Sequence, residues 1–226
     1  MTDLTVTCVF VRGPYPYTPE YVIRLERMVR KHLARPFRFV CLTDQPKAFK
    51  APIETIEIQS MLADGVIGYW NKIRLFDPEM GFKGRMLFLD LDTLVVSDLA
   101  PIVDYPAPFA LCEDELAHER PVHAINSAGL AIIRKFNASA MVWYAGLNRD
   151  LFEAWTPAVT GRLQSDQDWY AERYPNAAAM PYQWFPRISR VQPPWPDDAK
   201  VVLVKTPKNH IAAKQWPWFE PLWGAA

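Results

Sequence analysis

Hydrophobic positions in the first part of the chain predict strands and helices in alternation. Residues 4–11 are rich in Val, Thr and Phe and alternate weakly, which predicts a first strand. Thr18 and Pro19 are typical of a helix start, and apolar residues then recur at helical spacing to about Leu33. Residues 37–42 predict a second strand. Residues 66–76 predict a second helix, whose apolar stripe is Ile67, Trp70, Ile73 and Phe76.

The remaining pattern predicts a mostly parallel α/β sheet flanked by helices. Residues 86–89 form a continuous apolar run that stops at Asp90, which is typical of a central strand covered on both faces. Strands alternating with helices favour a Rossmann-like arrangement, and without a repeat or a linker we expect one domain over 1–226. Its C-terminal segment, from about 175 to 226, is rich in Pro and Trp. Further strands are expected over 109–112, 130–133 and 201–204, and further helices over 138–147 and 166–174.

Charge and cysteine content narrow the class of protein. Lys plus Arg equals Asp plus Glu at 25 each, so no surplus positive charge indicates a nucleic-acid partner. Cys8, Cys41 and Cys112 lie in apolar runs at no metal or redox spacing, which favours buried thiols in a reducing compartment. The first residues do not resemble a signal peptide, and no apolar stretch approaches the roughly 18 residues of a membrane span. We therefore expect a cytoplasmic protein without a transmembrane segment.

Two carboxylates follow the apolar run at 86–89, in the segment F-L-D-L-D-T. Ligands of open α/β sheets bind beyond the carboxyl ends of strands. While the backbone stays extended, residues two apart point the same way, so Asp90 and Asp92 are expected to converge. A hard divalent cation such as Mn²⁺ or Mg²⁺ relieves the repulsion and can be shared with a diphosphate. The alternative is structural: Asp90 ends a strand in water, and Asp92 caps a turn with Thr93.

Two enzyme classes carry an aspartate pair after a buried strand. One is the haloacid-dehalogenase-type phosphatase, whose D-x-D-G-T segment differs from this chain because Thr93 directly follows Asp92. Its later acidic pair would have to be Asp197 and Asp198, which lie among prolines that disfavour a strand. This is the less favoured interpretation. The other class is the nucleotide-sugar glycosyltransferases with a D-x-D motif.

The order of motifs resembles glycosyltransferase family 8, the glycogenin-like retaining enzymes, and is especially similar to small bacterial members. After the first strand and helix, the matching segments are F-V-C-L-T-D, N-K-I-R-L-F, L-F-L-D-L-D-T-L-V, N-S-A-G-L and S-D-Q-D-W-Y. The resemblance implies the GT-A fold, the nucleotide-diphospho-sugar transferase fold. It also implies that Asp90 and Asp92, with Leu91 between them, hold Mn²⁺ (or Mg²⁺) against the diphosphate of a UDP-sugar donor.

The resemblance also assigns roles to other residues. Arg12 and Tyr17, after the first strand, match the side of the nucleoside pocket. Lys72 matches a basic donor contact, for which a solvated helix lysine is the alternative. Asp166 and Gln167 match the pair beside the anomeric carbon, although Asp is also common at helix starts. Sugar contacts are implied for Asn126 and Ser127, with Gly129 allowing close backbone approach.

The third metal ligand has two possible positions in the C-terminal segment. Family members carry a histidine after the last strand. His210 fits one alignment and keeps a metal triad of Asp90, Asp92 and His210, whereas the other alignment places Lys205 there. We favour His210, with Lys208 or Lys214 as phosphate contacts.

The sequence thus predicts a retaining, metal-dependent glycosyltransferase that moves a hexose from a UDP-sugar to a glycan or lipid-linked acceptor. A catalytically silent sugar-nucleotide or glycan-binding domain of the same fold is the main alternative, because Ala213 and Trp216 depart from the family pattern. The aromatic cluster at 216–219 leaves room for peripheral membrane contact, although packing against the domain is favoured.

Overall fold

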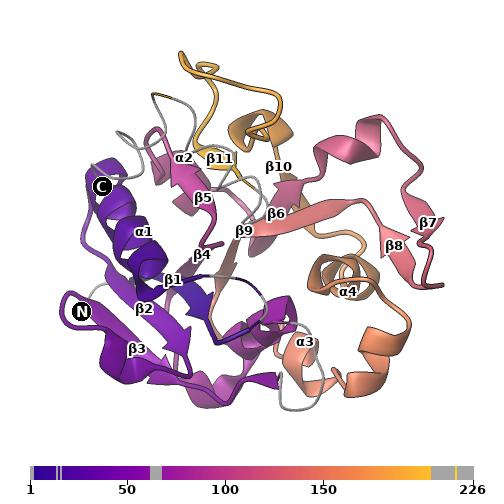
Figure 1. The fold of residues 1–226 in the computed structure, drawn as a ribbon, viewed down its shortest axis with the longest axis horizontal. Coiled ribbons are helices and arrows are strands. Elements are labelled where there is room, and N and C mark those ends of the chain that lie inside the picture. Colours follow the sequence, from indigo (N-terminus) through magenta and orange to yellow (C-terminus); the bar gives the residue numbers. More distant parts are fainter. Residues whose placement is uncertain (1–2, 14, 16, 62–67, 205–216, 218–226) are drawn as a thin grey trace.

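A seven-stranded sheet runs through the molecule in the order β10-β6-β9-β4-β1-β2-β3 (Figure 1). The computed structural model describes residues 3–13, 15, 17–61, 68–204 and 217. β1, β2, β3 and β4 are parallel neighbours, as are β6 and β10, whereas β9 pairs antiparallel with both β4 and β6. The strands are β1 (Leu4–Phe10), β2 (Arg38–Thr43), β3 (Ile53–Glu57), β4 (Arg85–Leu89), β6 (Phe109–Glu113), β9 (Phe136–Tyr144) and β10 (Ala178–Met180).

The predicted helix over 138–147 is wrong, because residues 138–144 belong to β9. Its alanine and methionine content favours a helix locally, but β9 lies between β4 and β6 and its first eight residues are buried. A strand hydrogen-bonded on both sides satisfies its backbone groups while covering both faces with apolar side chains. Tertiary pairing has therefore overridden local propensity.

Different elements cover the two faces of the sheet. Helix α1 (Pro19–His32) packs on one face with a small antiparallel sheet of β5 (Thr93–Val95) and β11 (Val201–Leu203). The other face is covered by the 3-10 helix η3 (Gly68–Phe76) and by α3 (Asp150–Glu153) and α4 (Asp166–Arg173). The short helix α2 (Ala100–Val103) follows β5. A second small sheet pairs β7 (His123–Ile125) with β8 (Ala131–Ile133) and lies apart from the main sheet at the right of Figure 1.

Most of the other predicted elements are confirmed. The first strand and helix, the strand at 37–42, the central strand at 86–89 and the strand at 109–112 lie where the sequence places them. The predicted strands at 130–133 and 201–204 also form, but in the small sheets rather than in the main one. Among the described residues, no helix has the length and apolar character needed to cross a membrane.

The segment expected as an α-helix over 66–76 is a 3-10 helix from Gly68. Trp70, Ile73 and Phe76 are all buried and lie three residues apart, the repeat of a 3-10 helix. With that repeat, Lys72 falls in a second row between Tyr69 and Leu75. The row faces the protein, so the lysine is buried rather than solvated.

Candidate active site at the carboxyl edge of the sheet

A cavity of about 410 Å³ lies at the edge where β1 and β4 end. This is the edge at which open α/β sheets bind ligands. Its wall combines the loop after β1, the start of η3, the turn after β4 and the start of α4. The lining residues are Val9, Val11, Gly13, Tyr15, Tyr17, Gly68, Tyr69, Lys72, Asp90, Leu91, Asp92, Gln164, Ser165, Asp166 and Gln167.

Asp90 and Asp92 both line this cavity, as the sequence predicts, although the backbone between them is not extended. Leu91 and Asp92 form a turn that leads from β4 into β5. The turn is held by the Asp90 backbone N–H, which donates to the Ser139 carbonyl at 2.8 Å, and by the Thr93 hydroxyl, which donates to the Asp90 carbonyl at 2.7 Å. The Leu91 side chain anchors the turn in the core.

Lys72 partly neutralises the acidic cluster, which consists of Asp90, Asp92 and Asp166. Its buried ammonium lies 2.8 Å from Asp90 Oδ1 and 3.5 Å from Asp166 Oδ2, and it donates to the Ala138 carbonyl at 3.4 Å. Burial alone lowers the pKa of Lys72, but the charges of Asp166 and Asp90 outweigh burial and raise that pKa above its ordinary value. The ammonium is therefore a fixed positive charge between two carboxylates.

Tyr17 caps the second aspartate. The Tyr17 hydroxyl donates to Asp92 Oδ2 at 2.9 Å. Burial and the neighbouring charge of Asp90 raise the pKa of Asp92 to about 6, while the Tyr17 hydrogen bond lowers it. Burial and the charge of Asp92 likewise raise the pKa of Tyr17, so the hydroxyl keeps its proton and remains a donor. Tyr17 thus contacts one carboxylate of the pair, that of Asp92.

Asp166 and Gln167 begin α4 and face the same cavity. Burial raises the pKa of Asp166 to about 6, and the Lys72 charge opposes this shift. Beside them lie Tyr69 and Gln164, which the sequence analysis did not single out. The Tyr69 hydroxyl donates to the Gln164 carbonyl at 2.6 Å. Tyr69 lies two residues before Asn71 and Lys72, and Gln164 directly precedes the S-D-Q segment. Their closeness to these motifs in the sequence is the only signal that could have indicated them.

Asn126, Ser127 and Arg12 are not among the residues that line the cavity. Asn126 shapes the turn between β7 and β8, where its Oδ1 accepts from the Ala128 and Leu130 N–H groups and Gly129 adopts a positive φ of 78°. Its Nδ2 donates to Gln164 Oε1 at 3.1 Å, which links this turn to the cavity wall. Ser127 is exposed on the turn. Arg12 is exposed, and its backbone N–H donates to the Asp44 carboxylate.

Asp168, a residue that sequence reasoning missed, joins the β7–β8 sheet to α4. It is fully buried, and its carboxylate accepts from the Ile133 N–H at 2.6 Å and from the Ser165 hydroxyl at 2.5 Å. Ser165 is the N-cap of α4. The pair therefore fixes the helix start, and with it Asp166 and Gln167, relative to β8. In the sequence, the position of Asp168 as the second aspartate of the S-D-Q-D segment was the signal that could have indicated it.

The donor set suits a hard cation, although it is incomplete within the described residues. Asp90 Oδ1 pairs with Lys72, and Asp92 Oδ2 pairs with Tyr17. Oxygen ligands of this kind match Mn²⁺ and Mg²⁺. No group of three His, Cys, Asp or Glu side chains suited to a metal occurs in the part of the chain that the structure describes. The expected third ligand, His210 or Lys205, and the phosphate contacts Lys208 and Lys214 lie outside that part.

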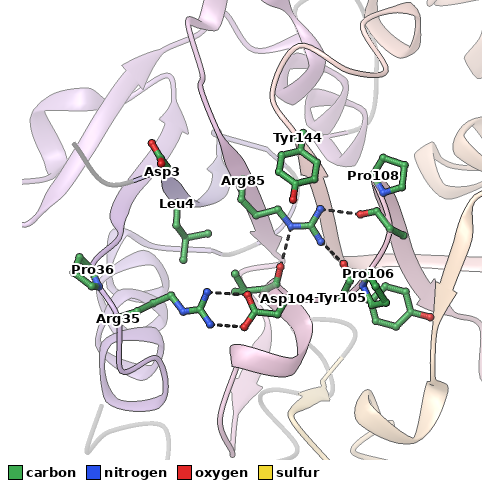
Figure 2. Close-up of a pocket in the computed structure, with 12 residues that line it drawn as sticks. Asp3, Leu4, Arg35, Pro36, Arg85, Asp104, Tyr105, Pro106, Pro108 and Tyr144 are labelled. Atoms are coloured by element: carbon green, nitrogen blue, oxygen red, sulfur yellow. Dashed lines mark hydrogen bonds and ion pairs between the residues drawn. The ribbon is translucent and has the colours of Figure 1, made fainter.

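A second cavity, of about 730 Å³, lies at the opposite edge of the sheet (Figure 2). Arg85 lines this cavity, but its guanidinium donates to the backbone carbonyls of Val103, Tyr105 and Ala107 at 2.8–2.9 Å. Arg35 and Asp104 pair with each other at its rim. These charged groups are satisfied by the protein itself, so the cavity has a structural role and is not the candidate active site.

Comparison with known proteins identifies the fold. No protein-family model and no curated protein sequence matches this chain. Among solved structures, the galactosyltransferase LgtC in complex with donor and acceptor sugar analogues matches with a TM-score of 0.69, covering 98% of this chain and 95% of LgtC. The chain has the GT-A fold. An active-site glutamine-to-glutamate mutant of LgtC also matches, with a TM-score of 0.63 over 88% of this chain and 86% of that one.

The sequence identities in these two matches are 14% and 15%, so the likeness is one of fold. LgtC is a galactosyltransferase of family 8 with the GT-A fold, and the match confirms the fold that the motif order implies. In this GT-A chain, the cavity of about 410 Å³ lies at the carboxyl edge of the parallel strands and contains both aspartates of the D-L-D segment.

Proposed function

We propose that this chain is a retaining, metal-dependent glycosyltransferase that moves a hexose from a UDP-sugar to a glycan or other acceptor. The observation that carries the proposal is that three segments distant in sequence line one cavity of a GT-A fold. They contribute Lys72, the pair Asp90 and Asp92, and the pair Asp166 and Gln167. The structural neighbour LgtC was solved with donor and acceptor sugar analogues, which supports sugars as the substrate class.

The charge balance of the cavity supports a divalent cation. Among the described residues, its lining contains the carboxylates of Asp90, Asp92 and Asp166 and the ammonium of Lys72. When all are ionised, a surplus of two negative charges remains in a half-enclosed space. Asp90 and Asp92 would hold the cation, which when bound supplies Lewis-acid stabilisation of the diphosphate leaving group.

The chain's own residues account for the rest of the proposed chemistry. As the sugar–phosphate bond breaks, positive charge develops at the anomeric carbon, and fixed carboxylate or amide oxygens nearby stabilise it. Asp166 and Gln167 supply these oxygens from the rigid start of α4. LgtC also has a glutamine in its active site, according to the mutant that was crystallised. Lys72 keeps Asp90 and Asp166 apart and correctly charged, and Tyr17 orients Asp92.

The direct test is calorimetry with a panel of nucleotide sugars, with and without Mn²⁺. We expect UDP-hexoses to bind only with the metal, and Asp92→Asn to remove this binding while keeping an acceptor for the Tyr17 hydroxyl. Asp197→Asn is the matched control, because Asp197 is exposed and absent from the cavity lining. Equal binding with and without Mn²⁺, or none to any UDP-sugar, contradicts the proposal.

Product analysis separates the alternatives. A transferase slowly hydrolyses its UDP-hexose when no acceptor is present and releases the sugar with the anomeric configuration of the donor, which NMR reports. Metal-dependent binding without any hydrolysis supports the silent binding domain. Phosphate release from simple monoesters supports the phosphatase.

A further inference from the structure

Two polar atoms on α4 are buried without a hydrogen-bond partner in the described part of the chain. They are the hydroxyl oxygen of Tyr170 and Oδ2 of Asp166. Asp166 Oδ2 lies 3.5 Å from the Lys72 ammonium, which makes an ion pair but leaves the oxygen unsatisfied as a hydrogen-bond acceptor. One atom is therefore a free donor, and the other is a free acceptor.

The helix brings these two side chains to the same face. Asp166 and Tyr170 are four residues apart in α4, the spacing at which helical side chains are neighbours. The Tyr170 ring is fully buried against Phe76 of η3, with 5.7 Å between ring centroids. Burial, followed by the negative charges of Asp166 and Asp90, raises the pKa of Tyr170. The hydroxyl consequently lies within the electrostatic reach of the acidic cluster.

An unpaired hydroxyl at this position has a cost. Burying a hydroxyl without a hydrogen bond costs about 1–3 kcal/mol, whereas phenylalanine fills nearly the same volume without that cost. Buried polar atoms are paired with protein or with ordered water in native structures, and each exception requires an explanation. Here the unpaired donor and the unpaired acceptor are neighbours on one helix face, so a hydrogen bond that links them would satisfy both atoms.

We propose that Tyr170 is a positioning residue for Asp166, and that its hydroxyl donates to the Asp166 carboxylate through one buried water molecule. The water accepts from Tyr170 and donates to Asp166 Oδ2, the oxygen that has no hydrogen-bond partner among the described residues. This water-mediated link depends only on the folded structure and not on the proposed function. Its effect on turnover rests on the proposed function, in which Asp166 lies beside the sugar.

The test compares Tyr170→Phe with the wild type in thermal unfolding. A bridged hydroxyl predicts that Tyr170→Phe lowers Tm by about 2–4 °C, as the loss of one buried hydrogen bond does in a chain of this size. A hydroxyl without a partner predicts the opposite sign, an unchanged or higher Tm. Tyr105→Phe calibrates the scale, because the Tyr105 hydroxyl donates to the Ala179 carbonyl at 2.8 Å, away from the site.

A double-mutant cycle with Asp166→Leu identifies the partner, since leucine has a similar volume and no acceptor. We expect the effect of Tyr170→Phe on Tm to vanish in that background. If Asp166→Leu does not fold, the sign of the single variant still decides. In the transferase assay, Tyr170→Phe is expected to lower kcat about tenfold and to leave KM for the UDP-sugar unchanged.

The proposal is overturned if Tyr170→Phe is at least as stable as the wild type, or if its loss of Tm persists with Asp166→Leu. A structural role alone would lower Tm without lowering kcat at a temperature where both proteins are folded, and that result also overturns it. If the wild type transfers no sugar at all, the proposed function fails, whereas the unfolding cycle still tests the link between Tyr170 and Asp166.

Discussion

The ammonium of Lys72 lies 2.8 Å from Asp90 Oδ1 and 3.5 Å from Asp166 Oδ2, and so connects η3 to the end of β4 and the start of α4. Three segments that are distant in sequence meet at this one charge. Because Lys72 and Asp166 are buried and Asp90 is partly buried, the pairing has consequences for stability as well as for binding.

Removing the Lys72 charge should destabilise the protein strongly. Lys72→Met leaves the buried Asp166 and the partly buried Asp90 carboxylates without a counter-charge, and loss of one partner of a buried ion pair costs about 3–5 kcal/mol. We expect urea unfolding to show a loss of this size at neutral pH. Lys47→Met, at an exposed lysine, should change stability by less than about 0.5 kcal/mol. Similar stability for the two variants would contradict the ion-pair arrangement.

Metal binding should weaken in acid. The pKa of Asp92 is raised to about 6, chiefly by burial, and the carboxyl must lose its proton to bind a cation. Calorimetric Mn²⁺ affinity should therefore fall as the pH decreases through about 6. The Tyr17 hydrogen bond lowers the pKa of Asp92, so Tyr17→Phe should move this loss to higher pH. A Tyr17→Phe profile identical to that of the wild type would argue against this coupling.

The raised pKa of Asp92 also determines how the stability of the metal-free protein changes with pH. The folded state binds the Asp92 proton more tightly than the unfolded chain, whose carboxyl has its ordinary pKa of 3.8. Between about pH 4 and 6 the native state therefore carries more protons, and the Asp92 contribution to stability decreases as the pH rises. Asp92→Asn should raise Tm by a few °C at pH 7.5 and by less at pH 5. An advantage that grows in acid would refute this sign.

Asp168 should be needed for the β7–β8 sheet to dock on α4. Asp168→Ala leaves the partly buried Ile133 N–H and Ser165 hydroxyl without their acceptor, at a cost of about 1–3 kcal/mol. Hydrogen exchange of the Ile133 amide should accelerate as well. Asp150→Ala is the comparison, because Asp150 pairs at the surface with Arg173, and we expect a loss of about 1 kcal/mol or less.

Arg85 should affect stability but not donor binding. Arg85→Lys keeps the charge but loses the planar arrangement that reaches three carbonyls (Figure 2), so Tm should fall by several °C. The affinity for the UDP-sugar with Mn²⁺ should stay within about twofold of the wild type, since this cavity lies at the opposite edge of the sheet. A large loss of affinity would instead make the second cavity part of the binding site.

Much of the fold and the centre of the site could be predicted because their signals are local. The apolar run 86–89 followed by Asp90 and Asp92 needs only strand burial and the edge rule for parallel sheets. β9 could not be predicted this way, because its strand state depends on partners in β6 and β4, which lie 23–34 and 51–59 residues earlier in the chain. Lys72 was placed by an α-helical repeat where the actual repeat is three, so its burial between two aspartates was missed.

The antiparallel direction of β9 has a consequence for how such a protein can diversify. Since β6 ends at the edge that carries the site and β9 starts there, residues 114–135 leave the sheet and return to it on the same side. An exchange of this excursion for a longer or shorter one changes no strand register. Under the proposed function, chimaeras that graft another chain's excursion between Glu113 and Phe136 offer a route to altered acceptor preference on the same seven-stranded sheet, provided that the graft keeps an N–H donor for Asp168 at the position of Ile133.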